Sequence, residues 1–116
     1  LTFTRDVAEG VFWLLGYRDG DVEPSAPCEY GVYNLTGVGA VKSRAEIAAK
    51  IFNLRNGNGD AVVPVSSVDY CNKAGRSVSA RPMHLSLSLS KIENAGYIPS
   101  DWEITLVEFV CNGLSL

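Results

Sequence analysis

The most informative segment of the sequence reads Ser79-Ala80-Arg81-Pro82-Met83-His84-Leu85-Ser86-Leu87-Ser88-Leu89-Ser90-Lys91-Ile92. Pro82 fixes its own φ and keeps Arg81 out of the α region, so the arginine is held on extended backbone. A guanidinium presented in this way, shortly before a helix that begins near Ser90, suits a bidentate anion such as a diphosphate. A surface arginine in a loop is the alternative, and these residues alone leave both interpretations open.

The start of the chain predicts an amphipathic helix. Thr4 or Asp6 can cap it, and it should end between Gly16 and Gly20. Its apolar residues follow the spacing of a single buried face: Val7, Val11, Phe12, Leu14 and Leu15. We therefore expect this face to pack into the core.

The middle of the chain predicts a loop, a strand and a second helix. Residues 19–29 are polar, contain two prolines and read as a loop. Residues 32–35 are expected to form a short strand that a glycine-containing turn closes. Ser43 and Glu46 then match a capping box, and the helix that they open should stop before residues 56–59, Asn-Gly-Asn-Gly.

The segments on both sides of the informative segment predict one more strand and three short helices. Residues 61–65 are rich in β-formers but contain Pro64, which is typical of an edge strand. A short helix is expected over residues 67–74. Two further capping boxes, at residues 90–93 and 100–103, open the last helices. The final helix carries apolar residues on one side: Trp102, Leu106, Phe109 and Val110.

Helical and strand-like segments alternate along the chain, which favours an α/β fold. We expect a small, helix-rich domain with a short two- or three-stranded sheet. At 116 residues the chain is long enough for one domain with a modest core. That domain should span residues 1–112 and leave 113–116 as a tail.

Composition excludes several classes of protein. The net charge of −3 and scattered basic residues argue against a nucleic-acid partner. No apolar run is long enough to span a membrane and no signal-peptide pattern is present, so we expect a cytoplasmic protein. The cysteines Cys28, Cys71 and Cys111 form neither a disulfide framework nor a metal motif. Because the chain begins with Leu1 and not Met, we expect it to be a piece of a longer protein.

The sequence lacks the motifs of dinucleotide-dependent catalysis. Gly37-Val38-Gly39 misses the third glycine of a dinucleotide-binding turn, so a tight turn explains it better. No tyrosine has a lysine four residues later, and Tyr70 and Lys73 are only three apart. His84 is the sole histidine, which disfavours a catalytic triad or a histidine-based metal site. We therefore predict no catalytic, cofactor-binding or metal-binding residues in this chain.

The order of several motifs nevertheless points to a family. The motifs are Thr2-x-Thr4-x-Asp6-Val7-Ala8, Gly31-Val32-Tyr33-Asn34-Leu35-Thr36-Gly37, Ser43-x-x-Glu46, Ala80-Arg81-Pro82 and a closing helix with Trp102. Over about residues 1–110, this order resembles the C-terminal part of the dTDP-4-dehydrorhamnose reductases. These are nucleotide-sugar enzymes of the extended short-chain dehydrogenase/reductase superfamily.

The resemblance implies a division of labour between two portions. An N-terminal Rossmann domain, absent from this chain, would bind NADPH (or NADH) and hold the catalytic Thr/Ser, Tyr and Lys. This chain would be the portion that binds the dTDP-sugar, with no reductase activity alone. The whole enzyme would reduce the C4 keto group of dTDP-4-dehydro-L-rhamnose, giving dTDP-L-rhamnose for bacterial cell-surface polysaccharide.

The resemblance also assigns the substrate-binding residues. Arg81 would contact the nucleotide-sugar, Pro82 would set its geometry, and His84 falls where the family more often has Asn. A histidine at the edge of a loop, bonded to backbone, is the alternative role for His84. The resemblance implies that Asp6 caps the first helix and that Trp102 only packs.

Two other functions stay open. One is a non-catalytic module that binds and regulates a partner, as in the related regulatory subunit of methionine adenosyltransferase. The other is part of a nucleotide-sugar epimerase or dehydratase, which shares the fold. In each case the natural partner would be the missing Rossmann domain, and the apolar face turned towards it could pair with a second copy. The sugar, the nucleobase and a fused 3,5-epimerase domain are equally open.

Overall fold

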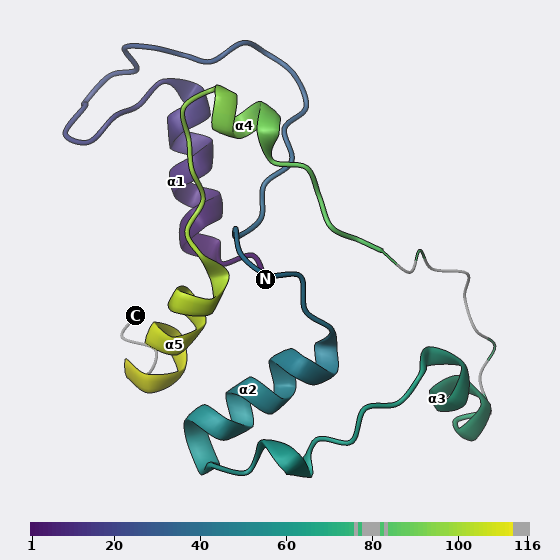
Figure 1. The fold of residues 1–116 in the computed structure, drawn as a ribbon. Coiled ribbons are helices and arrows are strands. Elements are labelled where there is room, and N and C mark those ends of the chain that lie inside the picture. The colour runs from purple at the N-terminus through teal and green to yellow at the C-terminus, as the bar shows by residue number, and fades with distance from the viewer. Residues whose placement is uncertain (76, 78–81, 83, 113–116) are drawn as a thin grey trace. The chain divides into compact units, whose positions relative to one another are not determined.

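The computed structural model describes residues 1–75, 77, 82 and 84–112 (Figure 1). In chain order its helical elements are α1 (Thr4–Leu15), α2 (Arg44–Asn56), the 3-10 turn η1 (Gly59–Ala61), α3 (Ser67–Lys73), α4 (Ser90–Asn94) and α5 (Trp102–Asn112). The chain divides into two compact units: unit 1 is Leu1–Ala40 with Ser86–Leu106, and unit 2 is Val41–Leu85 with Val107–Leu116. The predicted tail at 113–116 lies outside the described residues.

The helix-rich part of the predicted fold is confirmed, whereas the sheet is not found in the described residues. Their only β-pairing is an isolated parallel bridge between Val38 and Asp101. The predicted strand at 32–35 pairs with no other strand in the described residues. The Val32 carbonyl instead accepts a hydrogen bond from Lys91 Nζ, and the Asn34 side chain donates through Nδ2 to the Ser88 carbonyl. The predicted edge strand at 61–65 is not found either: Ala61 ends η1, residues 62–65 form no strand, and Val63 is 75% exposed.

Helix α1 buries a different face from the one that its apolar pattern predicts. Its buried residues are Asp6 and Gly10, while the predicted core residues Val7, Val11, Phe12 and Leu15 are 41–56% exposed. The reason is the close approach of two side chains to Gly10. A Cβ there would lie 2.9 Å from Leu35 Cδ2 and 3.2 Å from Tyr97 Cε1. The missing side chain thus selects the face on which the helix packs.

Aromatic side chains complete this packing. Trp13 Nε1 donates to the Ala95 carbonyl at 2.9 Å, and Tyr97 Oη donates to the Asp6 carbonyl at 3.0 Å. Tyr97 is buried, and this desolvation, with smaller contributions from the charges of Glu9 and Asp6, raises the pKa of its phenol. Residues more than 80 positions apart in the sequence are thereby joined in unit 1.

The expected cap of α1 is wrong. The N-cap is Phe3, which makes no side-chain capping bond, and Thr4 is already the first helical residue. Asp6 lies in the first turn, where a carboxylate interacts favourably with the positive end of the helix dipole. Its side chain is fully buried, and neither carboxylate oxygen has a hydrogen-bond partner in the described part of the chain.

The C-terminal end of α1 is confirmed at Gly16, which adopts the left-handed conformation with φ of 98°. Arg18 fixes the loop that follows. Its Nη1 donates to the carbonyls of Trp13 and Tyr17, both at 2.9 Å, and its guanidinium carbon lies 3.8 Å from the centroid of the Trp13 ring. The Trp13 carbonyl, in the last turn of the helix, thus accepts a hydrogen bond from a cation, which the helix dipole favours.

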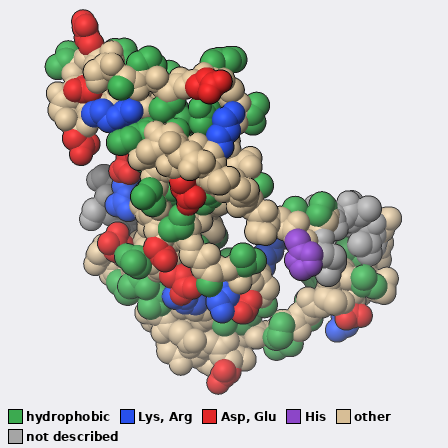
Figure 2. All heavy atoms as spheres, turned by 45° about the horizontal axis from the view of Figure 1, so that its top comes forward, with side chains coloured by type: hydrophobic (Ala, Val, Ile, Leu, Met, Phe, Trp, Pro, Cys, Tyr) green, Lys and Arg blue, Asp and Glu red, His purple; other side chains and the backbone are tan. Residues whose placement is uncertain are grey.

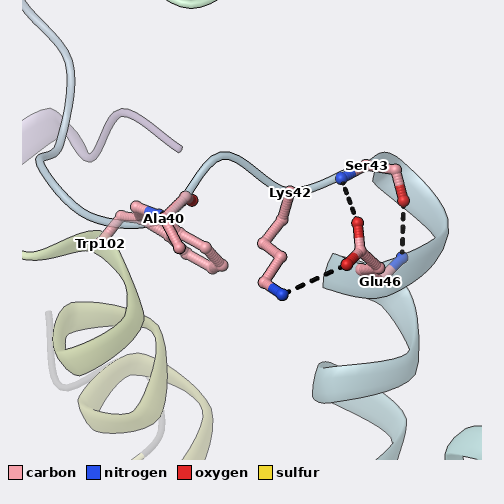
Figure 3. A network of polar contacts seen from close by, with 5 residues as sticks. All are labelled: Ala40, Lys42, Ser43, Glu46 and Trp102. Carbon is pink, nitrogen blue, oxygen red and sulfur yellow. Dashed lines mark hydrogen bonds and ion pairs between the residues drawn. The ribbon is translucent and has the colours of Figure 1, made fainter.

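Trp102 anchors the other side of unit 1 and confirms its predicted packing role. Its side chain is 4% exposed, and its Nε1 donates to the Ala40 carbonyl at 3.0 Å (Figure 3). The backbone pairs on both sides of it: Val38 N donates to Ser100 O and Trp102 N donates to Val38 O, both at 3.0 Å. Gly37 is needed here because a Cβ would come within 2.8 Å of Leu1 O and of Trp102 Cβ.

Two of the three predicted capping boxes are wrong. At α5, Asp101 replaces Ser100 as the cap, since its Oδ1 accepts from Glu103 N at 2.8 Å. At α4, the N-cap is Leu89 without a side-chain bond, and Ser90 is the first helical residue. The Ser90 hydroxyl lies 3.0 Å from that of Ser88 instead. Competing local partners therefore decide these two helix starts.

The third capping box, in unit 2, is confirmed. Ser43 Oγ accepts from Glu46 N at 3.2 Å, and Glu46 Oε2 accepts from Ser43 N at 2.7 Å (Figure 3). Lys42 Nζ adds a contact of 3.2 Å to Glu46 Oε1. The helix ends at the left-handed Gly57, as predicted, and η1 follows it. The short helix expected at 67–74 is also present as α3, with Ser66 as its cap.

We expect the start of α2 to weaken in acid. Hydrogen bonds from the Ser43 backbone and side chain, then from Lys42, lower the Glu46 pKa from 4.5 to about 2. Because the folded-state pKa is depressed, the stabilisation is fully present above pH 4.5 and is lost as the pH falls towards 2. An NMR titration of the Ser43 and Glu46 amides should show this loss, and Glu46→Gln should remove the pH dependence. Equal profiles in the two proteins would contradict the assignment.

Candidate functional site

The predicted substrate-binding residues fall where little of the structure is described. Arg81 lies outside the described residues. Pro82 and His84 are described and exposed, in unit 2. Within the described part of the chain, His84 has no hydrogen bond or ion pair, so the backbone-bonded role weighed for it is not found there. The three residues stay a prediction.

Unit 1 contains a cleft of about 460 Å³ that sequence reasoning did not predict. A loop wall, contributed by residues 28–33, faces residues from α4. The polar side chains that line it are those of Cys28, Glu29, Tyr33, Ser90, Lys91 and Asn94. A volume of this size is in the range of small-molecule sites, roughly 300–1,000 Å³.

Lys91 is the best-positioned side chain of this cleft. Its Nζ donates to the Val32 carbonyl at 3.0 Å and lies 4.5 Å from the centroid of the Tyr33 ring. Gly31 approaches so closely that a Cβ there would come within 2.8 Å of the same nitrogen. Three consecutive loop residues therefore hold the ammonium group at one place while it stays in contact with solvent.

Hydrogen bonds also fix the conformation of the loop wall. Tyr33 Oη donates to the Glu29 carbonyl at 2.6 Å, which closes the loop on itself. Asn34 Nδ2 donates to the Ser88 carbonyl at 3.2 Å and joins the loop to the segment before α4. Cys28 lies against the Ala95 and Trp13 carbonyls, with its Sγ 3.8 and 3.9 Å away. These contacts give the cleft a formed backbone before any ligand arrives.

The arrangement supports binding but not proton transfer to a carbonyl. In the reductase superfamily a lysine lowers the pKa of a tyrosine that donates this proton. Here the Lys91 ammonium lies over the Tyr33 ring, and the phenol hydroxyl is already bonded to the Glu29 carbonyl. The described residues also contain no group of three or more His, Cys, Asp or Glu residues placed to hold a metal ion.

Sequence reasoning missed this cleft because its parts are distant in the chain. Lys91 appeared only as a member of a capping box, and Tyr33 as part of a strand. No spacing rule connects the two, since their contact depends on how α4 packs against the loop. The nearest signal was Gly31, because a side chain there would have to displace the end of the Lys91 side chain.

No protein-family model, curated protein or solved structure matches this chain. Among the described residues, no helix is long and apolar enough to cross a membrane.

Proposed function

We propose that this chain is the substrate-binding part of an NADPH-dependent dTDP-4-dehydrorhamnose reductase of the cytoplasm. The observation that carries the proposal is the order and spacing of the motifs from Thr2 to Trp102. The chain supplies neither the hydride donor nor the proton donor, so it is inactive without its Rossmann half. In this proposal Arg81 contacts the diphosphate of the dTDP-sugar, and Pro82 and His84 belong to the same binding segment of the sequence.

The packing of unit 1 supports the part of the proposal that concerns the first, second and last motifs, which all lie in this unit. The first motif contains the start of α1. The residue that precedes this motif, Leu1, contacts the second motif, because Gly37 N donates to Leu1 O at 2.9 Å. The second motif in turn adjoins the last, because Val38 and Trp102 are paired through their backbones. Motifs from opposite ends of the sequence are thus neighbours in unit 1, as the proposal requires of motifs that belong to one domain.

The exposed apolar face of α1 supports the proposal that another domain packs against this helix in the parent enzyme. Val7, Val11 and Leu15 follow one another at intervals of four residues and lie 41–54% exposed. In Figure 2, hydrophobic side chains (green) are likewise visible at the surface among acidic and basic ones. A continuous apolar helix face is a common docking surface. We assign the absent Rossmann half as its cover in the parent enzyme.

Nucleotide titration tests the proposal. We expect dTDP to cause saturable shifts in the NMR spectrum of the ¹⁵N-labelled chain, and Arg81→Ala to raise the Kd about 10- to 100-fold through the loss of a charge-assisted bidentate contact. Arg44→Ala, an exposed arginine at the start of α2, is the matched control and should leave the Kd unchanged. Equal affinity in the parent chain and Arg81→Ala, or reduction of the keto-sugar by the chain alone, would contradict the proposal.

The same titration separates the two other functions. A non-catalytic partner-binding module, which the lack of a cofactor motif also fits, would bind neither dTDP nor UDP. An epimerase or dehydratase fragment that acts on UDP-sugars would prefer UDP. Either result would count against the reductase.

A further inference from the structure

Two opposite charges line the cleft of unit 1 without closing on each other. Glu29 belongs to the loop wall and Lys91 to α4. Ion pairs of the described residues include Arg5 with Glu9 and Lys42 with Glu46, but none of them joins Glu29 to Lys91. A cation and an anion that form no ion pair with each other therefore line the same cleft.

The cation keeps free hydrogen-bonding capacity. An ammonium group has three N–H donors, and the Val32 carbonyl accepts from one of them. The Tyr33 ring attracts the charge through its face and uses no specific N–H. Two donors thus stay available, on a nitrogen whose position is already fixed. Pre-positioning lowers the entropy cost of binding an anionic group.

The anion is equally available. The backbone carbonyl of Glu29 accepts from Tyr33, but its exposed carboxylate has no hydrogen bond or ion pair within the described residues. Asn94 adds an amide that can both donate and accept, and it too has no such partner there. The cleft therefore offers a donor site at one place and an acceptor site at another.

We propose that this cleft binds a small zwitterion of the free α-amino acid class. The ligand's carboxylate would contact Lys91, its ammonium group would contact Glu29, and the Asn94 amide would bridge to either. A simple anion such as phosphate would be repelled by Glu29, and a simple cation by Lys91, whereas a ligand with both charges satisfies both. The cleft volume of about 460 Å³ accommodates such a molecule. This proposal does not depend on the proposed reductase role.

NMR titration with the common amino acids tests it. We expect saturable shifts of the Tyr33, Lys91 and Asn94 amides with at least one of them. Analogues of that amino acid that lack one charge, its amide (cation only) and its N-acetyl derivative (anion only), should each bind at least about tenfold more weakly, since each loses one charge-assisted contact. Equal binding of the analogues would overturn the proposal, as would the absence of saturable shifts at these amides.

Charge-neutralising variants locate the site. Glu29→Gln keeps the shape of the side chain and the Tyr33 bond to the backbone, and we expect it to weaken the amino acid about tenfold. Lys91→Met should do the same. Glu23→Gln and Lys73→Met, exposed charges outside the cleft, are the matched controls. Unchanged affinity in Glu29→Gln, with a native-like spectrum, would overturn the assignment even if Lys91→Met disturbs the loop.

Discussion

Replacing Trp102 by alanine is expected to lower the free energy of unfolding by about 3–5 kcal/mol, the range for truncating a buried aromatic side chain. The side chain is 4% exposed, and it bonds the Ala40 carbonyl across unit 1. Truncation would remove the indole ring and leave a cavity beside Gly39, where a Cβ would lie only 3.1 Å from Trp102 Cδ1. Much of the marginal stability of a small domain would be lost.

Urea unfolding followed by circular dichroism measures this effect. Ile104→Ala is the control because it lies in the same helix, two residues later, and is 62% exposed. It should cost less than about 1 kcal/mol, as is usual for surface substitutions. Similar midpoints for the two variants would show that Trp102 does not anchor unit 1.

The second large effect is expected for Gly16→Ala, which should destabilise the protein by about 2–5 kcal/mol. Part of this cost is the left-handed conformation, with φ of 98°, which an L-residue adopts at about 1–2 kcal/mol. The rest is steric, about 1–3 kcal/mol. A Cβ at Gly16 would lie 2.5 Å from Pro27 N and 2.8 Å from Ala26 C, both backbone atoms that cannot rotate away.

Gly20→Ala separates the two contributions. Gly20 is also left-handed, with φ of 84°, but no atom lies within 4 Å of the position of its Cβ. This variant should therefore cost only the conformational part, about 1–2 kcal/mol. Thermal unfolding of both variants provides the comparison. If Gly20→Ala is as destabilising as Gly16→Ala, the packing of the 25–28 loop against the end of α1 is not what requires the glycine.

Both proposals assign a binding role to the chain. The proposed dTDP-sugar contact depends on Arg81, which only its Pro82 neighbour and the motif order identify. The cleft at Lys91 was found by the opposite route, from geometry without any motif. The two proposals are tested by different ligands and different variants, so either can fail alone.

Local signals predicted several helix boundaries well. The Ser43–Glu46 capping box and the glycines that end α1 and α2 act through contacts within a few residues, so the sequence around them is sufficient. The same type of signal failed at Ser90 and Ser100. There Ser88 and Asp101 offered competing partners, and the pattern gave no means of ranking them.

Long-range contacts decided what the pattern could not. The sequence pattern correctly predicted that α1 is a helix with apolar residues along one face. The helix nevertheless packs through Asp6 and Gly10, because Leu35 and Tyr97 approach the glycine. Likewise the run at 32–35 has strand-forming residues but no strand beside it. A strand requires a partner, and partners are set by tertiary packing.

By itself, the sequence determined where the main helices lie, that the chain lacks the motifs of dinucleotide catalysis, and which ordered motifs suggest a nucleotide-sugar enzyme. These properties depend on neighbouring residues or on residue identity alone. Only the tertiary structure decided which face of α1 is buried, why Gly37 has no side chain, and that Lys91 meets Tyr33 in a cleft whose other charge, Glu29, forms no ion pair within the described residues. Each of these depends on contacts between segments that are distant in the chain, and such contacts form only when the segments pack together.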